Sequence, residues 1–95
     1  MIVRLVRMEF KPENLADFLE LFAAVKNKIS SFKGCLFLEL KKEIGNDNAF
    51  FTLSHWDSEQ SLNAYRNSEL FSSVWTKTKI HFSGKPMAWT LTDSL

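Results

Sequence analysis

The chain has 95 residues, enough for one small domain (residues 1–95) but not for two, and its 45% hydrophobic and 24% charged content excludes disorder along the whole length. Twelve Lys and Arg nearly balance eleven Asp and Glu, and the net charge of +1 argues against a nucleic-acid-binding protein. Because there is no apolar run of membrane-spanning length, no signal-peptide pattern and only one cysteine, we expect a cytoplasmic protein without an internal disulfide, a membrane span or a cysteine-based zinc site.

The N-terminal third predicts a strand followed by a helix. Residues 2–10 are predicted to form a strand with Arg4 on one face and Arg7 on the other. Because both faces also carry apolar residues, we expect both faces of this strand to be at least partly covered. Proline at position 12 ends the strand. Residues 14–32 then show an apolar stripe at helical spacing, and Gly34 is a natural stop.

The rest of the chain predicts a hairpin, a divided helix and a last strand. Strands are expected at residues 35–42 and 49–56, antiparallel because a polar Gly/Asn-rich loop joins them. Asp57 with Gln60 resembles a capping box, and residues 67–69 (Asn-Ser-Glu) resemble a second cap. The following helix is therefore expected to break near Asn67 and to run on to about residue 82. A fourth strand is expected at residues 87–92.

This order, βαββαβ with the second α divided, is typical of an α+β ferredoxin-like sandwich, an antiparallel sheet with helices on one face. Nine Phe, three Trp and one Tyr are many rings for a domain that buries only about 60–65% of its unfolded surface. Two compatible explanations follow. One is a homodimer with two sheets packed face to face, and the other is a pocket lined by aromatic side chains.

No standard catalytic, phosphate-binding or metal-binding motif is present. His55 ends the third strand, where it fits either a base or an imidazole bonded to backbone or water. Tyr65 fits either a hydroxyl offered to a ligand or a half-buried ring with its hydroxyl in water. Arg4 or Arg7 could pair with Glu9, Glu39 or Glu43 across strands, or bind an anionic or phenolate ligand.

Other candidates have simpler readings. His81 and its neighbouring lysines fit a solvated position at a helix end, and Cys35 fits a small buried hydrophobe rather than a nucleophile. Phe71 and Trp75 are one helical turn apart, which is compatible with either core packing or a pocket wall.

Residues 51–58 (FTLSHWDS) and 62–71 (LNAYRNSELF) together resemble the antibiotic biosynthesis monooxygenase family. In this family a strand ends in Trp, a small polar cap follows, and the next helix carries an aromatic or His residue before a Ser-containing break and an apolar pair. The opening strand, the Lys-Pro boundary, the amphipathic helix and the Gly34-Cys35 junction fit as well, so the resemblance covers essentially the whole chain.

The resemblance implies a dimeric α+β barrel and an apolar cavity between sheet and helices. It implies a cofactor-independent monooxygenase in which an electron-rich quinol or polyphenol itself activates oxygen, with no metal and no bound cofactor. The haem-degrading branch uses Asn, Trp and His at positions that match Val6, Tyr65 and Trp75, so haem degradation is not expected. The quinol-oxidising branch often has a His where Tyr65 stands, and a tyrosine is a poor base at neutral pH.

Three hypotheses follow from the sequence. The first is a cofactor-independent monooxygenase for a small aromatic substrate, with Tyr65 or His55 as the catalytic candidate. The second is a non-catalytic dimeric module that binds a small hydrophobic or aromatic ligand. The third is a structural domain whose rings serve only core and dimer, and a cavity reached by Tyr65 would count against it. The residues expected to line or flank the pocket are Arg7, Phe22, Trp56, Tyr65, Phe71 and Trp75.

Overall fold

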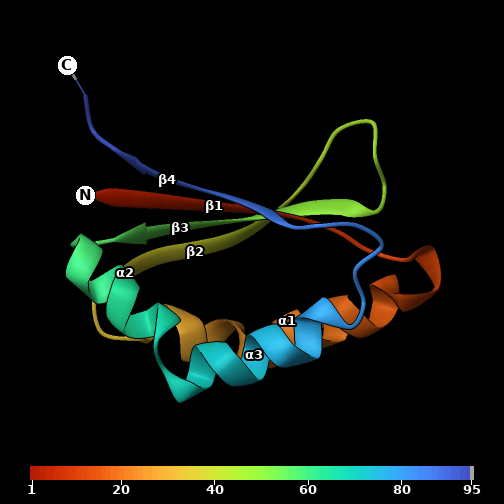
Figure 1. Cartoon of the computed structure of the whole chain (residues 1–95), viewed down its shortest axis with the longest axis horizontal. Coiled ribbons are helices and arrows are strands. Elements are labelled where there is room, and N and C mark those ends of the chain that lie inside the picture. Colours follow the sequence, from red (N-terminus) through yellow and green to blue (C-terminus); the bar gives the residue numbers. More distant parts are fainter. Residues whose placement is uncertain (95) are drawn as a thin grey trace.

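The computed structural model describes residues 1–94. Its elements follow the order βαββααβ, which confirms the predicted ferredoxin-like arrangement with a divided second helix (Figure 1). In chain order they are β1 (Ile2–Glu9), the 3-10 turn η1 (Pro12–Asn14), α1 (Leu15–Ser30), β2 (Cys35–Lys42), β3 (Ala49–Trp56), α2 (Glu59–Arg66), α3 (Glu69–Lys79) and β4 (Met87–Thr92).

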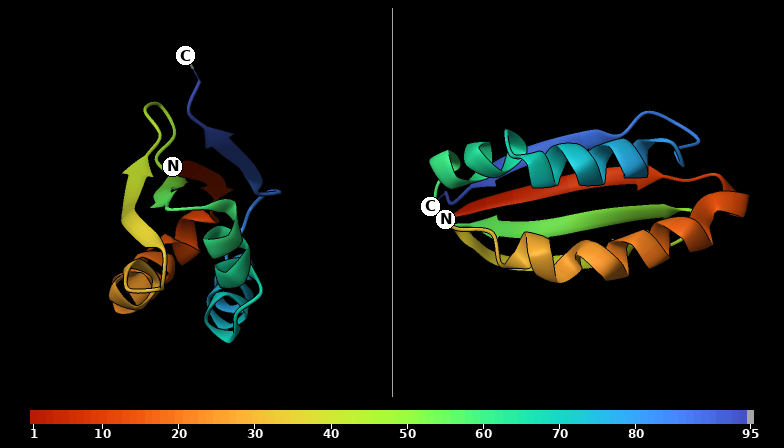
Figure 2. Two further views of the ribbon diagram at one scale, coloured as in Figure 1. Left: turned by 90° about the vertical axis from the view of Figure 1, so that its left-hand side faces the viewer. Right: turned by 90° about the horizontal axis from the view of Figure 1, so that it is seen from below.

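The four strands form one antiparallel sheet in the order β2-β3-β1-β4. All three helices lie on the same face of this sheet, and the opposite face carries none (Figures 1 and 2). In the register of the sheet, Arg4 pairs with Ser54 on β3 and with Thr90 on β4. Directly paired residues of antiparallel strands point to the same face, so the even-numbered residues of β1, β3 and β4 face the helices.

Local chemistry explains where the helices begin and end. Proline at the first position of η1 directs the chain into a 3-10 turn, so α1 begins one residue later than expected, at Leu15. The cap of α2 is Ser58, whose Oγ accepts from the Ser61 N–H at 3.2 Å, and not Asp57 as the sequence suggested. Ser68 caps α3 as expected, since its Oγ accepts from the Phe71 N–H at 3.1 Å.

The end of α3 also differs from the prediction. The helix stops at Lys79 rather than near residue 82, because Phe82 forms an isolated antiparallel bridge with Phe10. This bridge turns the chain back along β1 toward β4. It also places the Phe82 ring 5.5 Å from the Phe10 ring, so the segment that leaves α3 contributes to the core.

The core lies between the sheet and α1, at the end of the sheet where β1 finishes. Phe10 and Phe18 stack with ring centroids 4.0 Å apart, and Met8 and Phe50 complete this buried cluster. The other buried apolar residues are Ile29, Leu38, Ala49, Trp56 and Leu62. Burial of this apolar surface is the main favourable contribution to folding.

The sheet face away from the helices carries exposed apolar side chains among its charged ones. Trp89 and Leu91 on β4 are 41% and 47% exposed, and Phe37 on β2 is 42% exposed. Phe51 on β3 stacks against Trp89 with centroids 6.3 Å apart, so these two rings form an apolar patch that connects β3 to β4. We call this surface of odd-numbered strand residues the open face.

Candidate functional site

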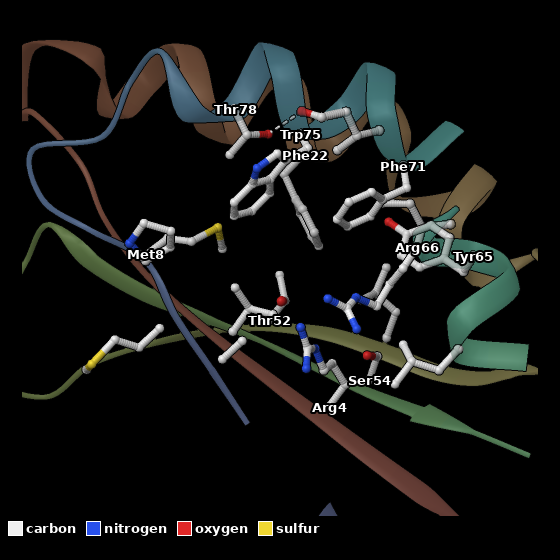
Figure 3. A pocket seen from close by; sticks show the side chains of 18 of the residues that line it. Arg4, Met8, Phe22, Thr52, Ser54, Tyr65, Arg66, Phe71, Trp75 and Thr78 are labelled. Carbon is white, nitrogen blue, oxygen red and sulfur yellow. Dashed lines mark hydrogen bonds between the residues drawn. The ribbon is translucent and has the colours of Figure 1, made fainter. Parts of the chain in front are cut away.

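A cavity of about 350 Å³ lies between the helix-side face of the sheet and the helices (Figure 3). Its floor is formed by even-numbered residues of β1 and β3, and α3 contributes a large part of the opposite wall. The volume is in the lower part of the range for small-molecule pockets. A cavity that Tyr65 lines argues against the purely structural hypothesis.

Three aromatic side chains build the apolar wall. Phe22 comes from α1, while Phe71 and Trp75 come from α3, where their spacing of one turn stacks the rings at 5.9 Å with planes 9° apart. The Trp75 ring also meets Phe82 edge-on at 5.5 Å, which fixes its orientation. Such a wall accepts flat apolar or aromatic groups by stacking and edge contacts.

Tyr65 closes one end of the aromatic wall. Its ring stacks on the buried Trp56 at 5.1 Å and meets Phe71 edge-on at 5.3 Å. Burial is the main reason that the pKa of Tyr65 is raised to about 12, with a smaller contribution from nearby Cys35. The hydroxyl therefore stays protonated at neutral pH, where it can donate a hydrogen bond to a ligand oxygen and does not act as a base.

The polar groups gather on the sheet side of the cavity. Thr52 and Ser54 lie on β3, and Arg4 lies beside them on β1, its Nη1 donating to Thr90 Oγ1 at 2.6 Å. Arg66, in the last turn of α2, points toward the same place (Figure 3). The cavity is therefore amphipathic, with rings on one side and hydrogen-bond donors on the other.

Four of the six pocket residues expected from the sequence line the cavity: Phe22, Tyr65, Phe71 and Trp75. Trp56 lies behind the wall, where its Nε1 donates to Ser54 Oγ at 3.0 Å. Arg7 is not part of the cavity. It lies on the open face, where its Nε donates to Glu43 Oε1 at 2.8 Å, so it adopts the cross-strand pairing that the sequence left as one alternative.

The remaining candidates lie elsewhere. His55 is on the open face, with its ring 5.1 Å from that of Phe37, so it does not reach the cavity. His81 shares a 3.0 Å hydrogen bond with the Asn14 side chain beyond the end of α3. Burial raises the pKa of the Cys35 thiol, which is the opposite of what a nucleophilic cysteine requires.

Among the cavity residues that the sequence did not predict are the polar side chains of Arg66, Thr52 and Ser54, and Arg4 was named without being chosen over Arg7. A usable signal was present in the two-residue period of the strand that ends at Trp56. Because Trp56 was expected to flank the pocket, Ser54 and Thr52 had to share its face. Arg66 carried no such signal, because a basic residue near a helix end usually faces solvent.

No group of three or more His, Cys, Asp or Glu side chains within residues 1–94 is arranged to hold a metal ion. In the same part of the chain, no helix is both long enough and apolar enough to cross a membrane.

Comparison with solved structures shows that the fold is shared over nearly the full chain. One crystal structure, described as an antibiotic biosynthesis monooxygenase, matches with a TM-score of 0.92 at 17% identity over 100% of both chains. A conserved protein from Methanosarcina mazei Go1 matches with a TM-score of 0.91 at 19% identity, over 99% of this chain and 94% of that one. Rv0793 from Mycobacterium tuberculosis matches with a TM-score of 0.89 at 13% identity over 98% of this chain and 94% of that one.

No curated protein matches this chain. Residues 1–75, however, match the family model described as antibiotic biosynthesis monooxygenase. This segment contains three of the four strands, both cavity arginines, Tyr65 and the aromatic wall. With the fold and the family model in agreement, the chain belongs to the antibiotic biosynthesis monooxygenase family.

Proposed function

We propose that this protein is a cofactor-independent monooxygenase that oxidises a small aromatic quinol or polyphenol with molecular oxygen. The observation that carries the proposal is the amphipathic cavity, in which the rings of Phe22, Phe71 and Trp75 face the donors on the sheet. In this proposal a flat substrate lies against these rings, with its oxygen atoms toward the donors on the sheet. Membership of the antibiotic biosynthesis monooxygenase family supports the proposed reaction class.

The proposed reaction balances with substrate and dioxygen alone. The phenol loses its proton to solvent water, and the resulting phenolate gives its electrons to dioxygen, which adds to a ring carbon that carries hydrogen. The peroxide formed there takes a proton back from water to become a hydroperoxide. The O–O bond then breaks and water leaves, so that one oxygen atom remains as a new carbonyl and the other departs in water. A phenol and one O₂ thus give a quinone and one H₂O, and all the electrons come from the substrate.

Tyr65 has the role of hydrogen-bond donor in this proposal. Its raised pKa of about 12 keeps the hydroxyl protonated, so it stabilises a substrate oxyanion by donation. Trp56 and Phe71 hold the ring from two sides, which limits movement of the hydroxyl. Such preorganised donors stabilise developing charge without reorganisation during the reaction.

Oxygen consumption with a panel of naphthohydroquinones and catechols tests the proposal. We expect enzyme-dependent uptake above the rate of autoxidation, and about a hundredfold lower kcat in Tyr65→Phe, which retains the ring stack but lacks the donor. Ligand affinity should fall little in the same variant. His55→Gln is the matched comparison, because it alters the other catalytic candidate, on the open face. Absence of turnover across the panel would refute the enzyme.

A non-catalytic ligand-binding module is the second candidate, and one observation favours it. The cavity lining within the described chain contains no carboxylate and no imidazole, so no side chain there has the pKa of a general base. Saturable binding of the same compounds without oxygen uptake would identify this function.

We also propose that two copies of the chain pair through their open faces. Trp89, Leu91 and Phe37 are each more than 40% exposed there, and an apolar surface of this kind is usually covered by a partner. Light scattering should give a dimer at micromolar concentration and a monomer for Trp89→Glu. The control is Ile44→Glu, because the Ile44 side chain in the β2–β3 loop is fully exposed. A monomeric wild-type protein would contradict this pairing.

A further inference from the structure

Two arginines approach one another at the sheet side of the cavity (Figure 3). Arg4 belongs to β1 and is partly buried, whereas Arg66 ends α2 and is exposed. Because Arg66 reaches solvent, the pair marks the place where the cavity meets water.

Within residues 1–94, neither arginine has an acidic partner. Among residues 1–94, none of the ion pairs involves Arg4 or Arg66, and the hydrogen bond of Arg4 goes to the neutral Thr90 hydroxyl. Arg7, three positions along β1 and on the opposite face of the sheet, shows the contrast, since Glu43 and Glu9 both lie within ion-pair distance of it. The cavity therefore holds a local positive charge that the described residues do not neutralise.

The surroundings of Arg4 make this charge unfavourable in the unliganded protein. Burial is the first cause of a lowered pKa at the Arg4 guanidinium, and the charge of Arg66 is the second. Two like charges that are partly removed from water repel each other, and an anion placed between them relieves both effects. Guanidinium groups bind carboxylates with paired N–H donors, which gives orientation as well as affinity.

We propose that the cavity takes a compact aromatic acid whose carboxylate lies between Arg4 and Arg66 and whose rings lie against Phe22, Phe71 and Trp75. The proposal names the class of substrate for the function proposed above: an electron-rich ring that carries a carboxylic acid. It rests on that function only for the oxidation by dioxygen, and not for the binding of the acid. The volume of about 350 Å³ limits the ligand to a small ring system. Ser54 and Thr52 remain available to the other polar atoms of the ligand.

A binding experiment separates this inference from the reaction. The probes are 2-naphthoate and 2-naphthamide, which have nearly the same shape and differ in charge, and titration calorimetry without oxygen consumption gives both affinities. We expect the acid to bind at least tenfold more tightly than the amide at low salt, and the difference to shrink as salt rises. Arg4→Gln and Arg66→Gln should each weaken naphthoate about tenfold and change naphthamide less than twofold.

Arg7→Gln is the matched control, because it removes the same charge from the same strand on the opposite face, and both affinities should stay unchanged. Circular dichroism confirms that each variant is folded. Equal affinities for 2-naphthoate and 2-naphthamide would contradict the anion site but not the proposed function. If neither compound binds, the cavity is not a binding site for such ligands, and both proposals fail. Inorganic phosphate is a third probe. If it binds as tightly as naphthoate, Arg4 and Arg66 form a general anion site and the proposal fails.

Discussion

Trp56 and Tyr65 stack with ring centroids 5.1 Å apart and planes inclined by 26°, although one ends β3 and the other lies within α2. Trp56 is almost completely buried, so it acts as a fixed surface for the tyrosine ring. The stack connects the core to the cavity. Its consequence is a phenol held in a largely apolar environment with its hydroxyl at the cavity wall.

Tyr65 should titrate near pH 12 in the folded protein. It is the single tyrosine of the chain, so phenolate absorbance at 295 nm reports this group alone, and denaturation should return its pKa to about 10. The folded protein holds the phenol in its neutral form more strongly than the unfolded chain does. The contribution of Tyr65 to the free energy of unfolding is therefore fully present below pH 10 and is lost as the pH rises toward 12. The loss is about 3 kcal/mol in order of magnitude.

Tyr65→Phe is the control for this pH dependence, because it keeps the ring and has no titrating group. Urea unfolding from pH 9 to pH 12 should show a smaller loss of stability in the variant than in the wild type. Parallel curves for the two proteins would contradict the assignment.

The hydrogen bond from Trp56 Nε1 to Ser54 Oγ is buried, and removing one partner should be costly. Ser54→Ala leaves the indole N–H without an acceptor, so we expect a loss of about 1–3 kcal/mol in the free energy of unfolding. In a Trp56→Phe background the same change should cost much less, because the donor is already absent. A double-mutant cycle in urea measures the difference, and additive effects would show that the bond contributes nothing.

Arg4 and Arg7 should respond in opposite directions to the same substitution. Arg4→Gln removes a partly buried charge that Arg66 repels, so stability should rise by about 0.5 kcal/mol or less after screening by solvent. Arg7→Gln removes the pair with Glu43, whose carboxyl pKa is held below its usual range by hydrogen bonding to Arg7, so stability should fall. Thermal unfolding of both variants checks the two signs, and a decrease in both would contradict the repulsion.

Gly34 and Gly45 share a positive φ of 89°, but only Gly34 is crowded. A Cβ at position 34 would overlap the Ser61 side chain, whereas position 45 has open space. Both Gly→Ala changes should cost about 1–2 kcal/mol for the left-handed backbone, and Gly34→Ala should cost more because α2 must also shift. Urea midpoints give the comparison, and equal losses would show that the crowding is relieved cheaply.

Most of the fold follows from local sequence patterns. The β2, β3 and β4 ranges agree with the alternation and turn residues that predicted them, because these strands begin directly after a glycine, an asparagine and a proline, respectively. The break between α2 and α3 also follows from sequence, since Ser68 can accept from a free N–H. The α2 cap was misassigned to Asp57 because Asp and Ser compete as caps at adjacent positions.

Sequence by itself thus determined the βαββααβ order, the family and four of the six expected cavity residues. Only the tertiary structure decided which strand face meets the helices. Alternation separates Arg4 from Arg7 but gives both faces apolar residues, so period alone assigns neither arginine to the cavity. The placement of Arg66 also depends on how α2 packs over the sheet. Long-range packing therefore determines the charge of the site, while local pattern determines its aromatic wall.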